Sequence, residues 1–176
     1  VEQLSELGIN PVDLSGPPQR YHALQLAASS ANALLQANAR EGIMRRAQEL
    51  QTSVTPPIPL GIQAEMRAYQ VEGYHFLTYL STNRFGGILA DDMGLGKTLQ
   101  TLTWIAWLRE QSEFKGKTVL IVCPKSVVQN WLSESARFLP EIKAVVWRGG
   151  DIKNLKKVVE SADLVVINYA QLRLSC

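Results

Sequence analysis

The chain has 176 residues, of which 46% are apolar and 19% are charged, a composition typical of a folded domain with a hydrophobic core and not of a disordered chain. Its formal net charge is only +2, which is too small to indicate nucleic-acid binding by itself. No apolar run approaches the roughly 20 residues of a membrane span. The two widely separated cysteines, Cys123 and Cys176, exclude a disulfide framework. We therefore expect an intracellular protein without a membrane segment.

The first predicted unit, residues 1–60, is an amino-terminal helical segment followed by a proline-rich linker. After an irregular lead-in, apolar residues recur at helical spacing between about residues 21 and 51, and Gly42 marks a break between two helices. The prolines of "TSVTPPIPLG" (52–61) then end the helical pattern. We interpret the segment as packing helices rather than as a cofactor or partner site.

The second predicted unit, residues 61–176, begins with a helix at about 64–82 and then alternates strands with helices. Runs rich in Val and Ile predict strands buried on both faces at 86–90, 118–123, 143–147 and 163–169, and helices are predicted at about 97–112, 125–138 and 151–161. This alternation indicates an α/β fold, in which helices flank a parallel sheet with right-handed crossovers. Trp104, Trp107 and Trp131 lie among apolar neighbours at helical spacing and are predicted to be core residues.

The stretch "GGILADDMGLGKTLQTL" (86–102), between a predicted strand and a predicted helix, has the character of a phosphate-binding loop. Gly94 and Gly96 allow the backbone to curl so that successive N–H groups from Met93 to Thr98 face one point. The start of the following helix adds partial positive charge. We expect Lys97 to reach the β- and γ-phosphates of a nucleotide and the Thr98 hydroxyl to ligate Mg²⁺.

The loop departs from the pattern G-x-x-x-x-G-K-[ST] at its first position. Asp91 stands six residues before Lys97, where the pattern has glycine, and Asp92 follows it. Aspartate tolerates turn conformations because its side chain can accept hydrogen bonds from nearby backbone N–H groups. Its carboxylate is expected either to face away from the phosphates or to contact them through Mg²⁺ or water. Either arrangement leaves a loop that can hold a polyphosphate.

This loop closely resembles that of the Swi/Snf-type ATPases, the DNA-translocating branch of helicase superfamily two, where an acidic pair commonly precedes Met-Gly-Leu-Gly-Lys-Thr. Three further stretches agree in order and spacing: "MRAYQVEGYHFL" (66–77) resembles motif Q, "VLIVCPKSVVQNWLSE" (119–134) resembles motif Ia, and "DLVVINYAQLR" (163–173) resembles a later strand and turn beside the DNA. The resemblance covers residues 66–176. It implies a P-loop, RecA-like lobe that uses ATP and Mg²⁺, binds the backbone of double-stranded DNA without sequence preference, and acts on a DNA-bound protein.

The resemblance also implies roles for individual residues. Gln70 would read adenine, and an amide suits this role because it both donates and accepts hydrogen bonds. A helix start after Pro124 would leave the N–H groups of Lys125, Ser126 and Val127 free for a DNA phosphate. Lys125, however, stands where the family more often has an apolar residue. Lys97 and Thr98 are the expected catalytic residues, with Thr98 as the metal ligand. The expected nucleotide-binding residues are Arg67, Gln70, Asp92, Met93, Gly94, Leu95, Gly96, Lys97, Thr98 and Leu99, and the expected DNA-binding residues are Pro124, Lys125, Ser126 and Tyr169.

The family's acid motif, of the type Asp-Glu-x-His, does not occur in this sequence, and neither does a second lobe with arginine fingers. We therefore expect residues 61–176 to be part of a first motor lobe that ends before the acid motif. Such a piece would bind nucleotide without hydrolysing it, whereas the intact protein would be a DNA-dependent ATPase. The "DDMGLGKT" form favours a bacterial member, which would work in the cytoplasm or nucleoid; a eukaryotic member would be nuclear.

Two alternatives from other classes stay open. A P-loop phosphotransferase would need a substrate lid and basic residues after the loop, where "TLQTLTWIAWLRE" offers an apolar helix instead. A non-catalytic module would recruit a partner through its amino-terminal helices and carry a vestigial loop, but Lys97 and Thr98 are intact. The next 40 residues of the gene would distinguish these alternatives from the ATPase hypothesis, because an acid motif there would indicate an ATPase motor.

Overall fold

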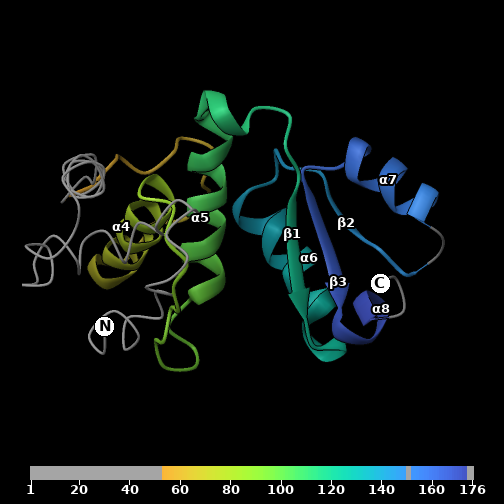
Figure 1. Ribbon diagram of the computed structural model, residues 1–176. Helices are drawn as coiled ribbons and strands as arrows, with labels where there is room; N and C mark the ends of the chain where they lie inside the picture. The colour runs from red at the N-terminus through yellow and green to blue at the C-terminus, as the bar shows by residue number, and fades with distance from the viewer. Residues whose placement is uncertain (1–52, 150–151, 174–176) are drawn as a thin grey trace, which may run out of the picture. The chain divides into compact units, whose positions relative to one another are not determined.

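The computed structural model describes residues 53–149 and 152–173 (Figure 1). The helices predicted between residues 21 and 51 lie outside the described residues, as does Cys176. The chain divides into two units, one containing residues 1–55 and 79–88 and the other residues 56–78 and 89–176. The division passes through the helix α4 (Ala68–Thr82). Among the residues that the structure describes, no helix combines the length and apolar character needed to cross a membrane.

In the first unit, the chain turns back on the last turn of α4 instead of entering a strand. Arg84 adopts the left-handed conformation (φ 56°), and the backbone N–H of Phe85 donates to the carbonyl of Leu80 at 2.8 Å. These features are those of a helix C-cap. A Cβ on Gly87 would lie 2.3 Å from Leu80 Cδ1, so the absence of a side chain there allows the close return.

The prediction of a buried strand at residues 86–90 is therefore wrong. These residues belong to no helix or strand and pair with no strand in the described chain, and Ile88 is 84% exposed. The apolar run at this point is short and begins with two glycines, which weaken a strand because they add no side chain to its packing. The tie of Phe85 and Gly87 to the end of α4 decides the local structure instead.

In the second unit, a parallel sheet has the strand order β1-β3-β2, which confirms the predicted sheet type. The strands are β1 (Val119–Cys123), β2 (Ala144–Val146) and β3 (Leu164–Asn168). Val119 is paired in register with Leu164, and Cys123 with Asn168. The helical elements of this unit besides α4 are α5 (Lys97–Glu110), η2 (Ser112–Phe114), η3 (Lys125–Val127), α6 (Val128–Phe138), α7 (Ile152–Ser161) and α8 (Tyr169–Arg173).

The central strand β3 is buried on both faces, as its run of Val and Ile predicts. Leu164 and Val166 contribute to one apolar cluster with residues of α5 and α6, whereas Val165 and Ile167 contribute to a second cluster near α7 and α8. Alternate residues of a strand point to opposite faces, so a single strand supports both helical layers (Figure 1). Trp104 and Trp131 pack against the first cluster, as predicted, and Trp107 is half-buried.

Asp163 joins the amino end of β3 to its neighbours. Its carboxylate accepts a hydrogen bond from the backbone N–H of Lys143 at 2.8 Å and forms an ion pair with Arg109 near the end of α5. Partial burial acts to raise the pKa of Asp163, but the Lys143 hydrogen bond and the Arg109 guanidinium outweigh it and lower that pKa. The carboxylate therefore stays ionised and holds α5 and β2 to the central strand.

The described part of the proline-rich segment is hydrogen-bonded to α4. The Tyr74 hydroxyl of α4 donates to the carbonyl of Pro57 at 3.0 Å, and His75 Nε2 lies 3.1 Å from the carbonyl of Pro56. Burial, and then the charge of Glu110, raise the pKa of the Tyr74 phenol, so its hydroxyl stays a proton donor. The proline carbonyls are thus paired with side chains of α4.

Candidate nucleotide-binding site

The loop between Asp91 and Lys97 has the backbone of a phosphate cradle. Gly94 and Gly96 both have positive φ, 85° and 78° respectively, which glycine adopts at little cost. A Cβ on Gly94 would meet nothing within 4 Å, whereas a Cβ on Gly96 would lie 2.5 Å from Gln70 Nε2. Gly94 is therefore needed for its backbone angle, and Gly96 for both angle and space. The side of the loop at Gly94 is open, as a polyphosphate requires.

The helix α5 begins directly after the loop, as predicted. The backbone N–H of Gln100 donates to the carbonyl of Gly96 at 3.1 Å, so the N–H groups of the first turn have no helical acceptor of their own. They and the helix dipole favour an anion at this end. Thr98 lies in this first turn and is half-buried, while Asp92 and Met93 are exposed at the loop tip.

The Lys97 ammonium group lies over the start of the loop. Its Nζ donates to the carbonyl oxygens of Asp91 and Asp92 at 2.7 and 2.8 Å. Because an ammonium group has three N–H donors, one remains for a phosphate oxygen among the contacts of the described residues. The positive charge is thus already fixed at the mouth of the loop.

The carboxylate of Asp91 is bound within the chain. Its Oδ2 accepts a hydrogen bond from Gln100 Nε2 of α5 at 2.9 Å. The donor is a side-chain amide, where the sequence predicted a backbone N–H. Gln100 was not expected to belong to the site. A fully buried glutamine within an apolar helix face requires a polar partner, and this signal could have identified it from the sequence.

Gln70 contacts the loop from the first turn of α4. Its Nε2 donates to the carbonyl of Leu95 at 3.1 Å, its Oε1 accepts from the backbone N–H of Arg67 at 3.0 Å, and the residue is only 8% exposed. An amide offers two N–H groups and two lone pairs, so one of each remains for an adenine edge. The role of Gln70 in reading adenine stays a prediction.

A surface pocket of about 410 Å³ lies beside the loop. The pocket is lined by the segment before α4, by the loop and by the end of α6. The backbone N–H of Gln63 donates to the carbonyl of Phe138 at 2.8 Å and so joins the first of these segments to the end of α6. The lining residues are Gln63, Ala64, Glu65, Arg67, Tyr69, Gln70, Gly94, Leu99, Arg137 and Phe138. Of these, Arg67, Gln70, Gly94 and Leu99 were predicted to bind nucleotide.

Sequence reasoning did not identify Arg137 and Phe138 as pocket residues. The Arg137 guanidinium lies 4.8 Å from the centre of the Phe138 ring, an arrangement typical of a cation–π pair. Nothing in the sequence pattern places the end of α6 beside residues 63–70, because the two segments meet only through the fold.

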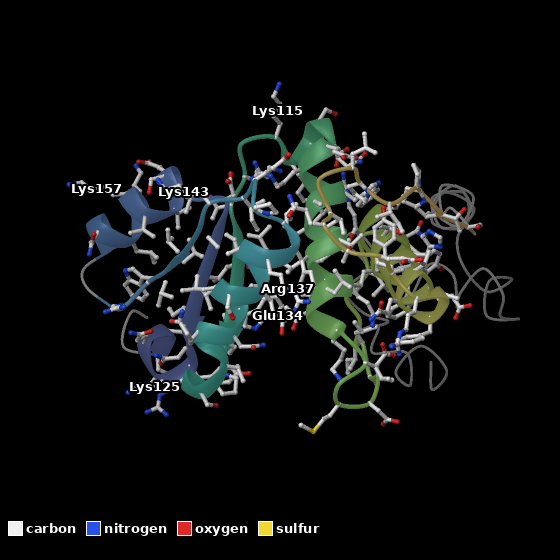
Figure 2. All side chains as sticks on the ribbon, turned by 180° about the vertical axis from the view of Figure 1, so that it is seen from behind. Lys115, Lys125, Glu134, Arg137, Lys143 and Lys157 are labelled. Atoms are coloured by element: carbon white, nitrogen blue, oxygen red, sulfur yellow. The ribbon has the colours of Figure 1, made fainter. Side chains whose placement is uncertain are left out.

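The residues predicted to bind DNA lie together at the carboxyl edge of the sheet. Cys123 and Asn168 are paired in register, so Lys125 and Tyr169 follow adjacent strand ends. Lys125 is exposed and Tyr169 is 57% exposed, as are Pro124 and Ser126 beside them. Figure 2 shows Lys125 at one end of the second unit and Lys115 and Lys143 at the other.

One detail of this edge differs from expectation. The element after Pro124 begins as a short 3₁₀ turn, η3, before α6 starts at Val128. The backbone N–H of Val127 donates to the carbonyl of Pro124 at 3.1 Å and is not free, contrary to the prediction for this group. Burial raises the pKa of the Cys123 thiol, which acts as an apolar core residue beneath the edge.

The family model of the SNF2-related domain matches residues 69–176 of the chain. Over 124 residues the chain is 38% identical to the TATA-binding protein-associated factor MOT1 of Saccharomyces cerevisiae, with coverage of 64% of the chain and 7% of that protein. Over 116 residues it is 41% identical to the ISWI chromatin-remodeling complex ATPase ISW1 of the same yeast, with coverage of 63% and 10%. The chain thus spans a tenth or less of these relatives.

Solved structures match the fold as well. The SWI2/SNF2 ATPase core domain of Sulfolobus solfataricus superposes with a TM-score of 0.61 at 33% identity, covering 71% of this chain and 25% of that one. The core of the same organism in complex with dsDNA gives a TM-score of 0.58 at 33% identity, covering 66% and 24%. The α/β fold with its parallel sheet flanked by helices is therefore that of an ATPase core.

Proposed function

Because the chain belongs to the SNF2-related domain family, which residues 69–176 match, we propose that it is the ATP-binding part of a DNA-dependent ATPase and translocase. The observation that carries this proposal is the loop at the start of α5, where two glycines with positive φ precede Lys97. Open backbone, a helix start and a fixed ammonium group are together what a polyphosphate requires.

The phosphates would lie in the loop between Met93 and Thr98, with the third N–H of Lys97 directed to them. The Thr98 hydroxyl, at the start of α5, would ligate Mg²⁺, and the ion would neutralise phosphate charge when bound. The exposed Asp92 at the loop tip would contact the ion through water. The donor chemistry fits, since hydroxyl and carboxylate oxygens are the ligands that Mg²⁺ prefers.

The base would enter the pocket lined by residues 63–70 and the end of α6. Gln70 would use its remaining N–H and lone pair on the adenine edge, and the Arg67 and Phe138 side chains would flank the base. Since the opposite donor and acceptor pattern of guanine leaves buried groups unpaired, we expect ADP to bind about tenfold more tightly than GDP.

Titration of the 176-residue chain with a fluorescent ADP, followed by competition with unlabelled GDP, tests this proposal. We expect saturable binding in the presence of Mg²⁺ and no multiple-turnover phosphate release, with or without DNA, because the sequence has no acid motif to position water. Multiple turnover that depends on Lys97 would contradict the second part. Equal competition by ADP and GDP would remove Gln70 from base recognition.

The partner of the carboxyl edge would be the backbone of double-stranded DNA. Lys125, Ser126 and Tyr169 offer a cation and hydroxyl groups, which hold phosphates without reading bases. This edge is the carboxyl end of the parallel strands, where ligands gather in open sheets, and we expect it to respond to both nucleotide and DNA. In a protein that carried this chain together with the rest of a motor, a DNA-bound protein would then be the remodelling target.

Replacing Lys125 by alanine should reduce the salt dependence of duplex binding. Each phosphate neutralised by a lysine releases a counterion, so the slope of log affinity against log salt concentration should fall by about 1. The measurement is fluorescence anisotropy of a labelled duplex of arbitrary sequence across a series of low salt concentrations. Lys115→Ala is the matched control, because Lys115 is exposed at the opposite end of the same unit (Figure 2). An equal slope for both variants would show that this edge does not bind DNA.

A further inference from the structure

Gln100 is completely buried, although it is a polar residue in the second turn of α5. Its Nε2 donates to Asp91 Oδ2 at 2.9 Å and lies 3.4 Å from the carbonyl of Leu95. One side-chain amide from the helix therefore contacts both the first residue of the loop and a residue next to its second glycine. The two contacts span the loop from its start to its end.

The Leu95 carbonyl receives a second amide from another element. Gln70 Nε2 of α4 donates to the same oxygen at 3.1 Å. Two glutamines from different helices thus converge on one loop carbonyl, which fixes the orientation of the peptide group between Leu95 and Gly96. This peptide group carries the N–H of Gly96, one of the groups expected to face the phosphates.

A notch in α4 makes room for Gln100. A Cβ on Gly73 would lie only 1.7 Å from Gln100 Oε1, so any side chain at position 73 would displace the amide. Gln100 Oε1 itself is buried and has no hydrogen-bond partner among the described residues. A buried acceptor without a partner costs free energy, so the amide is held in this position by the contacts of its Nε2 with Asp91 and Leu95.

The contacts continue from Gln100 to Lys97 through one residue. The Asp91 side chain is held by Gln100, while the Asp91 carbonyl accepts a hydrogen bond from Lys97 Nζ at 2.7 Å. Glycine at position 91 could supply the carbonyl but not the carboxylate that ties it to α5. An aspartate in the first position of the loop therefore links the Lys97 ammonium group to Gln100 of α5.

We propose that Asp91 and Gln100 are positioning residues, which hold the loop backbone and Lys97 in the conformation that binds the nucleotide phosphates. The inference rests on the proposed function, because it concerns the same phosphate site. Neither side chain would itself contact the phosphates. Both act through the Asp91 carbonyl and the Leu95–Gly96 peptide group.

The test is a double-mutant cycle on fluorescent ADP affinity in the 176-residue chain. Asp91→Ala and Gln100→Ala should each weaken ADP binding about fivefold, as expected for one lost hydrogen bond, and the double variant should be no weaker than the weaker single variant. Asp91→Asn should stay within about twofold of the parent, because its amide oxygen still accepts from Gln100. Gln111→Ala, which removes a glutamine bonded to the Trp107 carbonyl near the other end of α5, should leave affinity unchanged.

Hydrogen exchange of the amides of residues 93–98, measured without nucleotide, separates this inference from the proposed function. We expect faster exchange there in Asp91→Ala and Gln100→Ala, and parent-like exchange in Asp91→Asn and Gln111→Ala. If the parent binds no ADP but the exchange pattern appears, the proposed function fails while the positioning of the loop stands. Additive losses in the double variant, or an Asp91→Asn variant as weak as Asp91→Ala, would overturn the positioning role.

Discussion

Replacing Lys97 by alanine should weaken ADP binding by on the order of 100-fold, since it removes a charge-assisted hydrogen bond to the phosphates. The Lys97 ammonium group is already held over the loop by two carbonyl oxygens, at 2.7 and 2.8 Å. Its charge is thus fixed in place before a nucleotide binds, and little freedom is lost on binding. Fluorescent-ADP titration in Mg²⁺ buffer measures the loss.

Lys115→Ala is the matched control for this variant. Lys115 is an exposed lysine at the end of the second unit opposite the loop (Figure 2). Its loss therefore changes the net charge equally without affecting the loop. Thermal unfolding of both variants should remain close to that of the parent. A Lys97→Ala variant that binds ADP as tightly as Lys115→Ala would remove the loop from nucleotide binding.

Replacing Leu164 by alanine should lower the free energy of unfolding by about 3 kcal/mol, within the range for a buried leucine that leaves a cavity. Leu164 is 0% exposed and lies in the apolar cluster between the sheet and the helices α5 and α6. The loop leads directly into α5, and α5 packs in this cluster, so the cluster also holds the site in position. Urea unfolding followed by circular dichroism gives the change.

Leu120→Ala provides the comparison for this core variant. Leu120 lies on the adjacent strand β1 but is 51% exposed, so the same substitution there should cost less than about 1 kcal/mol. The difference between the two leucines isolates burial from the loss of strand propensity, which the pair shares. Equal costs would mean that the central strand does not form the core assigned to it.

The sequence predicted the parallel sheet because the three strands that form it are continuous runs of apolar, mostly β-branched residues. Burial on both faces produces that pattern in Leu164 to Ile167 without help from distant residues. The beginning of α5 was equally predictable, since glycine, lysine and threonine at this spacing are typical of a phosphate-binding loop that leads into a helix. In both places the structure favoured by the local sequence is also the one that the overall fold contains.

The failures occurred where tertiary contacts decide. Residues 86–90 satisfy the local signal for a strand, yet the chain is tied back to α4 through Leu80. The convergence of Gln70 and Gln100 on Leu95 depends on how two helices approach one loop. Arg137 enters the pocket only because α6 ends beside residues 63–70. The spacing of residues along the chain does not predict such contacts between distant segments.

The notch at Gly73 has a consequence for how this sequence can change over generations. A side chain added at position 73 would clash with Gln100 Oε1. A shorter side chain at position 100 would leave an empty space beside Gly73. Each change alone is penalised, and only the two together restore a filled interface between α4 and α5. The two positions therefore constrain each other in evolution, although they lie 27 positions apart along the chain.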